Sequence, residues 1–162
     1  DILVNNAGAT WGAPAEDHPL DAWDKVMNLN VRSIFLLSQA VGKLSMIPRK
    51  YGRIVNFATV ATPLNLEGEA CYAASKAAVE SLTRVAAREL APFNITVNAV
   101  GPTPVMTDLI RTVPKKKMDA LIGTQAIRRM GEHRDIANVI DFFVSRESDF
   151  ITGQTIFLGG IN

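Results

Sequence analysis

Cysteine, long apolar runs and an excess of either charge are all scarce in this sequence. A single cysteine among 162 residues excludes an intramolecular disulfide and is typical of a reducing compartment. The sequence contains no run of about eighteen apolar residues, the length needed to cross a bilayer. The 17 basic and 16 acidic side chains give a net charge of +1, which disfavours nucleic acid or a membrane surface as a partner. We therefore expect a cytoplasmic protein without a membrane-spanning segment.

The sequence also lacks an initiating methionine, internal repeats and low-complexity linkers. Its first residues, Asp1 to Val4, are typical of a buried strand, and natural domains rarely begin in the middle of a sheet. We therefore expect residues 1–162 to form one domain that is the C-terminal portion of a larger fold. The missing part would be cleaved or simply not included.

Short apolar runs rich in β-branched residues alternate with helical patterns along the chain. This alternation predicts an α/β fold with a doubly wound parallel sheet of about four strands, covered by helices on both faces. In the longest helix we expect an apolar stripe of Trp23, Met27, Asn30, Ile34, Leu37, Val41 and Leu44. Strands are predicted at 2–4, 53–58, 95–100 and 155–158, and helices at 20–47, 72–91, 136–144 and, as short pieces, within 107–127.

Tyr72 and Lys76 stand four residues apart at the start of a predicted helix, so they share one face about one turn apart. An ammonium beside a phenol favours the phenolate, which predicts a lowered tyrosine pKa and a role in general acid–base catalysis. The spacing alone is weak, because a surface Tyr and Lys on an amphipathic helix give the same pattern. Its position after a parallel strand, where such sheets bind ligands, strengthens the prediction.

Three other features allow two interpretations each. Asn30 lies within an apolar stripe, so it either joins two core elements or holds a water in a relay. Thr59 follows a strand, where a hydroxyl either ends the strand or meets a ligand. The basic run at 115–117 is either a solvated face or a lid over an anionic substrate.

Together these motifs resemble the short-chain dehydrogenase/reductase family over residues 1–162. The resemblance is carried by the order and spacing of five features, and it is closest to the β-ketoacyl-acyl-carrier-protein reductases. Those features are Asn-Asn-Ala-Gly at 5–8, Asn30-Val31, the hydroxyl of Thr59, Tyr72-x-x-x-Lys76, and the segment from Pro102 to Asp108.

The resemblance implies a Rossmann-type fold and an oxidoreductase that uses NADP or NAD, with a slight preference for NADP, on a carbonyl, alcohol or acyl-carrier substrate. Tyr72 would exchange the proton, Lys76 would lower its pKa and hold the nicotinamide ribose, and Thr59 would bind the substrate oxygen. Asn30 would anchor a water beside Lys76. Cofactor contacts would come from Asn6, Ala7, Gly8, Tyr72, Lys76, Pro102, Val105 and Thr107, and no metal is implied.

The chain departs from the family pattern in three ways. Thr59 and Thr103 stand where the family usually has Ser and Gly, so Thr103 is expected to narrow the nicotinamide pocket. The glycine-rich loop that binds the pyrophosphate is absent. An alternative is therefore a non-catalytic, self-associating piece that binds no dinucleotide. In either case we expect a homodimer or homotetramer through the helices at 20–47 and 72–91.

Overall fold

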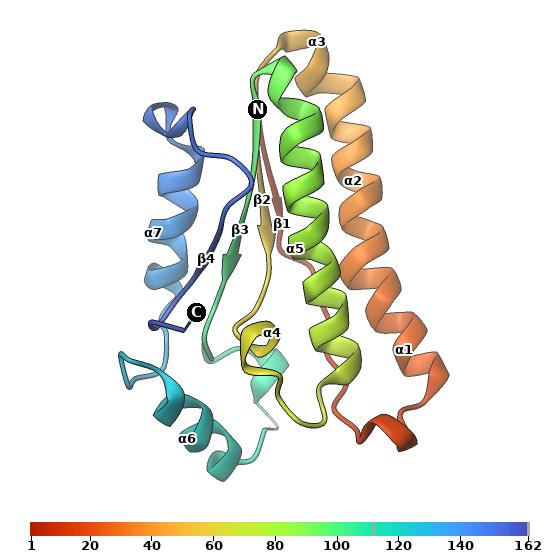
Figure 1. The fold of residues 1–162 in the computed structure, drawn as a ribbon, viewed down its shortest axis with the longest axis vertical. Helices are drawn as coiled ribbons and strands as arrows, with labels where there is room; N and C mark the ends of the chain where they lie inside the picture. The colour runs from red at the N-terminus through yellow and green to blue at the C-terminus, as the bar shows by residue number, and fades with distance from the viewer. Residues whose placement is uncertain (112, 162) are drawn as a thin grey trace.

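The computed structural model describes residues 1–111 and 113–161 and contains one parallel sheet of four strands in the order β1-β2-β3-β4 (Figure 1). Each strand neighbours the next one along the chain, and the crossovers between them are helical. The predicted α/β fold with a doubly wound parallel sheet is confirmed. The strands are β1 Ile2–Asn5, β2 Gly52–Phe57, β3 Ile95–Gly101 and β4 Thr155–Phe157.

The long helices match the predicted ranges closely, and α3, α4 and η4 end at residues with positive φ, namely Lys50, Asn65 and Asn94. The N-terminal helices are η1 Ala15–Asp17, α1 Leu20–Met27, η2 Asn28–Arg32, α2 Ser33–Val41, η3 Gly42–Met46 and α3 Ile47–Arg49. The later helices are α4 Ala61–Leu64, α5 Ala70–Leu90, η4 Ala91–Phe93, η5 Asp108–Ile110, α6 Lys115–Thr124, α7 His133–Val144 and η6 Arg146–Ser148.

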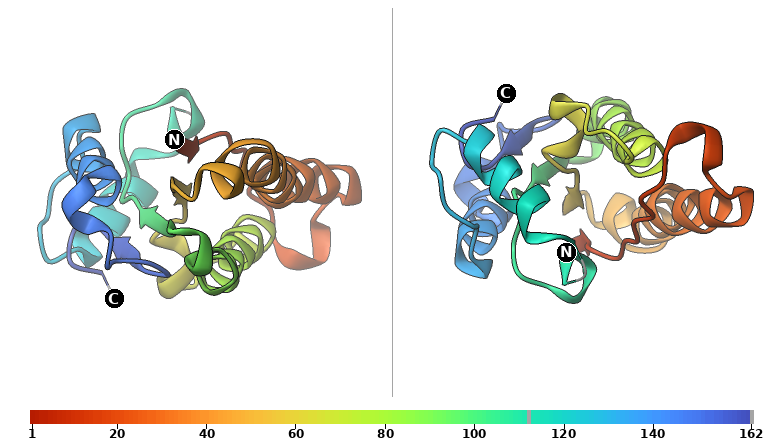
Figure 2. Two further views of the ribbon diagram at one scale, coloured as in Figure 1. Left: turned by 90° about the horizontal axis from the view of Figure 1, so that it is seen from above. Right: turned by 90° about the horizontal axis from the view of Figure 1, so that it is seen from below.

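Helices cover both faces of the sheet, as alternating strand side chains require. The helix pair α1–α2 and α5 lies on one face and α7 on the other, which Figures 1 and 2 show from the side and from the ends. Ile54 of β2 joins Met46 and Val97 in the core under the first pair. Its neighbour Val55 points the other way and packs with Phe143 of α7.

The long helix at 20–47 is continuous, but its predicted apolar stripe was wrong in part. Trp23, Leu37 and Leu44 are exposed, and Leu44 is 84% exposed. The reason is the two π-helical segments η2 and η3, whose wider turns make the buried face recur every fourth residue. That face consists of Ala22, Val26, Asn30, Ile34, Gly42 and Met46.

The outer edge of the sheet is formed by β1, on which Ile2 and Val4 are both exposed while Leu3 packs toward the helices. The alternation shows that the β1 face opposite α2 carries no covering helix among the described residues. The later helix α7 covers β2 and β3. The described helices also include none with the length and apolar character needed to cross a membrane.

Candidate functional site

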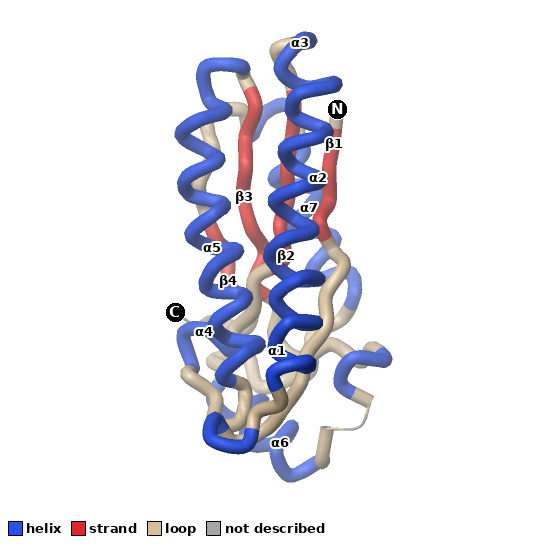
Figure 3. Tube along the Cα trace, turned by 90° about the vertical axis from the view of Figure 1, so that its right-hand side faces the viewer, coloured by secondary structure: helices blue, strands red, loops and turns tan. Residues whose placement is uncertain are grey.

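The predicted site residues gather where the four parallel strands end. Tyr72 and Lys76 lie in the first turns of α5, Thr59 follows β2, and the segment after β3 runs alongside. The view of Figure 3 places the beginnings of α1 and α5, the α4 turn and α6 at the same end of the molecule. This is the edge at which open α/β sheets bind ligands.

Lys76 is almost completely buried, with 4% of its surface exposed, and its ammonium donates to the carbonyl oxygen of Phe57 at 2.8 Å. The same nitrogen lies 5.8 Å from the centroid of the Tyr72 ring. The prediction that these two side chains share one face of the helix is confirmed. Burial lowers the pKa of Lys76 to about 8, because the ammonium loses much of its hydration.

The Thr59 side chain lies beside the Tyr72 hydroxyl, so the hydroxyls predicted to meet a substrate are adjacent. The Thr59 hydroxyl also accepts from the Ala61 backbone N–H at 3.3 Å. Burial raises the pKa of Tyr72; the neighbouring Thr59 side chain lowers it, and the charge of Glu69 raises it further. The predicted lowering of this pKa was therefore wrong for this structure. The cost of burying a phenolate outweighs the stabilising contacts, so Tyr72 stays protonated at neutral pH.

The depressed pKa of Lys76 makes a pH-dependent contribution to stability. The folded pKa of about 8 lies below the ordinary value of 10.5, so the folded state releases its proton first as pH rises. The unfolding free energy should therefore increase between about pH 8 and 10.5, by up to about 3 kcal/mol. Urea unfolding of the Lys76→Met variant, which has no proton to release, supplies the baseline. A parallel pH dependence in both proteins would contradict the depressed pKa.

Asn30 is fully buried in the π-helical segment η2 and uses its whole amide group. It accepts from the Ala9 backbone N–H at 2.8 Å and donates to the Ala9 carbonyl at 2.8 Å and to Ser75 Oγ at 2.9 Å. These contacts join the segment after β1 to the long helix and to α5. They support the interpretation of Asn30 as a residue that joins core elements, and the water relay stays a prediction.

The glycine at position 8 explains how the segment after β1 reaches this cluster. A Cβ at Gly8 would lie 3.4 Å from Asn30 Oδ1 and 3.6 Å from Lys76 Nζ. These are ordinary van der Waals distances, so the segment after β1 passes directly beside the ammonium. Its neighbours Asn6 and Ala7 are exposed at the same strand end.

The segment after β3 divides into buried and exposed residues. Thr103 and Val105 are buried, whereas Pro102 is half-buried and Thr107 is exposed. A Cβ on Gly131 or Gly159 would meet the Thr103 side chain at 3.0 or 2.7 Å. Thr103 therefore packs against these two glycines, and the expectation that it narrows a nicotinamide pocket stays a prediction.

Two neighbours of the site were missed in the sequence. The Ser75 hydroxyl accepts from the Asn30 amide and donates to the Tyr72 carbonyl oxygen at 2.7 Å. The sequence pattern that could have predicted this role is a serine on the buried face of a helix. Glu69 accepts from Thr10 at 3.0 Å, one turn before Tyr72. Glu69 also lines a cavity of about 530 Å³. Its lining comes from residues 12–16 and 67–69 and from Lys117.

Comparison with known proteins decides the family. A family model described as "Enoyl-(Acyl carrier protein) reductase" matches residues 1–161. The chain is 39% identical over 165 residues to an NAD-dependent glycerol dehydrogenase of Listeria innocua. It is 38% identical over 159 residues to the 3-oxoacyl-[acyl-carrier-protein] reductase FabG of Pseudomonas aeruginosa. The chain belongs to the short-chain dehydrogenase/reductase family.

Solved structures of this dehydrogenase/reductase family have the same fold. A gluconate 5-dehydrogenase from Burkholderia cenocepacia, in complex with NADP and tartrate, superposes with a TM-score of 0.94 at 34% identity and matches 99% of this chain. The chain spans 63% of that structure, 63% of the Listeria protein and 64% of the Pseudomonas protein. The Rossmann-type fold predicted for this chain is therefore confirmed.

The residues present fit one end of a nicotinamide cofactor. Lys76 has three N–H donors and donates one to the Phe57 carbonyl, and Gly8 lies next to the ammonium. A nicotinamide ribose has hydroxyl oxygens that accept such donors. Among the described residues, no glycine-rich turn leads from a strand directly into a helix, so the pyrophosphate end has no equivalent site in them.

Proposed function

We propose that this reductase chain transfers hydride between NAD(P) and a carbonyl or alcohol substrate, with Tyr72 as the general acid–base. The observation that carries the proposal is the contact between the Tyr72 and Thr59 hydroxyls at the carboxyl edge of the sheet, with the Lys76 ammonium beside the same ring. The relatives support the reaction class, because they are named as dehydrogenases and as 3-oxoacyl reductases.

The two hydroxyls define where a carbonyl oxygen would bind. Thr59 would hydrogen-bond that oxygen and stabilise the negative charge that develops on it. Tyr72 would then donate its proton to the same oxygen, because the phenol, whose pKa is raised by burial, is protonated at neutral pH. When bound, a nicotinamide cofactor supplies the hydride.

Lys76 would support both the phenol and the cofactor. With a pKa of about 8 it exchanges protons near neutral pH, so it can return a proton toward the Tyr72 region after each reaction. Its remaining donors would hold the nicotinamide ribose. Asn6, Ala7, Pro102, Val105 and Thr107 would contact other parts of the cofactor.

Cofactor binding tests the proposal. Titration with NADPH, and separately with NADH, should enhance the reduced nicotinamide fluorescence until it saturates, with NADPH the tighter ligand. Adding a 3-oxoacyl thioester should then consume the signal. Saturable binding without turnover would indicate that the chain binds the cofactor but does not catalyse the reaction. Failure to bind either cofactor would favour the non-catalytic, self-associating alternative.

Thr59→Ala should lower turnover by about 10- to 100-fold, because only a hydrogen bond to the substrate oxygen is lost. This decrease should be smaller than the one caused by loss of the Tyr72 hydroxyl. Thr59→Ser keeps the hydroxyl and should restore most of the rate. The measurement is kcat for carbonyl reduction at pH 7. A Thr59→Ala rate as low as that of the tyrosine variant would contradict the division of roles.

We also propose that the chain self-associates through the helices at 20–47 and 72–91. The outer face of α2 and η3 exposes an apolar group of Phe35, Leu36, Leu37 and Leu44, and α5 exposes Val85. Contiguous exposed apolar side chains of this size mark interaction surfaces. Light scattering should show a dimer or tetramer, and Phe35→Glu should shift it toward monomer. Unchanged mass in that variant would contradict the surface assignment.

A further inference from the structure

A buried arginine lies at the opposite end of the sheet from Tyr72. Arg53 stands at the start of β2 and is only 2% exposed. Its Nη1 donates to the Gly52 carbonyl at 3.1 Å, and its guanidinium lies over the Tyr51 ring, 4.8 Å from the centroid. Its Nε is buried and has no hydrogen-bond partner. Burying a guanidinium costs free energy unless hydrogen-bond acceptors pair with its N–H donors and offset its charge. The Arg53 Nε lacks such an acceptor.

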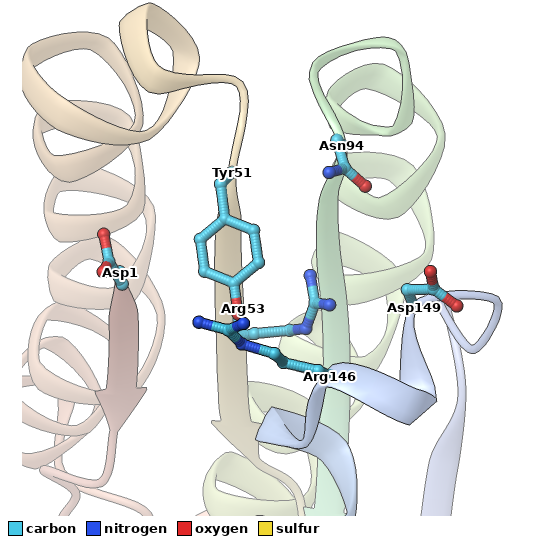
Figure 4. Close-up of a pocket in the computed structure, with 6 residues that line it drawn as sticks. All are labelled: Asp1, Tyr51, Arg53, Asn94, Arg146 and Asp149. Atoms are coloured by element: carbon cyan, nitrogen blue, oxygen red, sulfur yellow. The ribbon is translucent and has the colours of Figure 1, made fainter.

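A cavity of about 390 Å³ opens beside this side chain. Figure 4 shows the side chains of Tyr51, Arg53 and Arg146 meeting in front of β2, with Arg146 reaching in from η6. Two guanidinium groups therefore face one cavity. Its lining is Asp1, Tyr51, Arg53, Asn94, Arg146 and Asp149.

The carboxylates of the cavity do not neutralise these arginines. Asp1 forms an ion pair with Arg49 at 2.9 Å. Asp149 is exposed and lines the same cavity. Among the ion pairs of the described residues, none involves Arg53 or Arg146. The cavity therefore combines a buried, unmatched positive charge with a second arginine.

We propose that this cavity is a second binding site, specific for a phosphate group that is either free or carried by a small metabolite. Guanidinium groups bind phosphate through paired N–H donors, and the Arg53 Nε–H is available for one such bond. Tyr51 and Asn94 offer further polar groups at the rim. The volume is within the range of small-molecule sites and exceeds what one phosphate fills. The site lies at the amino ends of the strands, so it does not overlap the Tyr72 site.

The Arg53 Nε–H itself reports binding in a proton–nitrogen NMR spectrum. Titration of the intact chain with inorganic phosphate, and separately with glycerol 3-phosphate, at constant ionic strength should shift this resonance to saturation. Arg146→Gln should weaken binding about 10-fold, because one of two guanidinium groups is lost. Asp149→Asn should tighten it, because a nearby negative charge is removed. Arg32→Gln, an exposed arginine on η2, is the matched control and should change nothing.

The two ligands separate the possible sources of the phosphate. Equal affinity would show that the site binds the phosphate group alone, and tighter binding of glycerol 3-phosphate would show that it binds a phosphorylated metabolite; both outcomes support the proposal. A shift that never saturates, or one that is the same in Arg146→Gln, would mean non-specific screening. Either of these results overturns the second site. None of these variants replaces Arg53, so the fold is preserved for the test.

Discussion

Replacing Tyr72 with phenylalanine is expected to lower kcat by about 10²–10⁴-fold, because the variant keeps the ring and loses only the proton donor. The substitution also removes a buried hydroxyl that lies beside Thr59. The thermal transition should change little, since the aromatic ring is retained. The measurement is the steady-state rate of carbonyl reduction at pH 7 with saturating cofactor, together with the cofactor Kd.

Measuring kcat and the cofactor Kd separately makes this test specific to the chemical step. A residue that acts only on the chemical step lowers kcat and kcat/KM together and leaves the cofactor Kd unchanged. If Tyr72→Phe retained more than about half of the normal kcat, the acid–base role would be wrong. If it lost cofactor affinity and kcat in parallel, Tyr72 would be a cofactor-binding residue instead.

Asn30→Ala is expected to lower the unfolding free energy by about 3 kcal/mol, because it leaves the Ala9 N–H, the Ala9 carbonyl and the Ser75 hydroxyl without their partner. Asn28→Ala is the matched control, since Asn28 is exposed in the same π-helical segment and should cost under about 0.5 kcal/mol. Urea unfolding curves of both variants give the comparison. Equal stability of the two variants would contradict the structural role of Asn30.

The same variant also separates the two interpretations of Asn30. If the residue only joins core elements, the pH profile of kcat in the alanine variant should keep its shape. If Asn30 also anchors a proton relay to Lys76, the alanine variant should shift that profile even at temperatures where it is fully folded. The kcat–pH profile therefore tests a role that the contacts alone leave as a prediction.

Much of the fold was predictable because local patterns and global topology agree here. The β-branched runs around Val55 and Val97 are strands, and their alternation with helical segments can give only a parallel sheet with helices on both faces. The buried face of the long helix was not predictable in the same way. A regular period of 3.6 placed Leu37 and Leu44 in the core, whereas the π-helical segments moved them to the surface.

The mutual placement of Tyr72, Lys76 and Thr59 was predictable, whereas their electrostatics were not. Spacing alone placed Tyr72 and Lys76 on one face, and strand order placed Thr59 near them. The direction of the Tyr72 pKa depends on how deeply the phenol is buried, and sequence spacing carries no information about burial depth. The packing of Thr103 against Gly131 and Gly159 likewise depends on residues distant in sequence.

Deuterium transfer tests the central claim most directly. The protein would be mixed with nicotinamide cofactor deuterated at C4 and with an acetoacetyl thioester, and the product analysed by mass spectrometry. We expect one deuterium on the new carbinol carbon, formed rapidly by the natural sequence and at least about 100-fold more slowly by Tyr72→Phe. A product that carries no deuterium, or that forms at the same rate in the variant, would contradict the assignment of Tyr72 and Thr59 to carbonyl reduction.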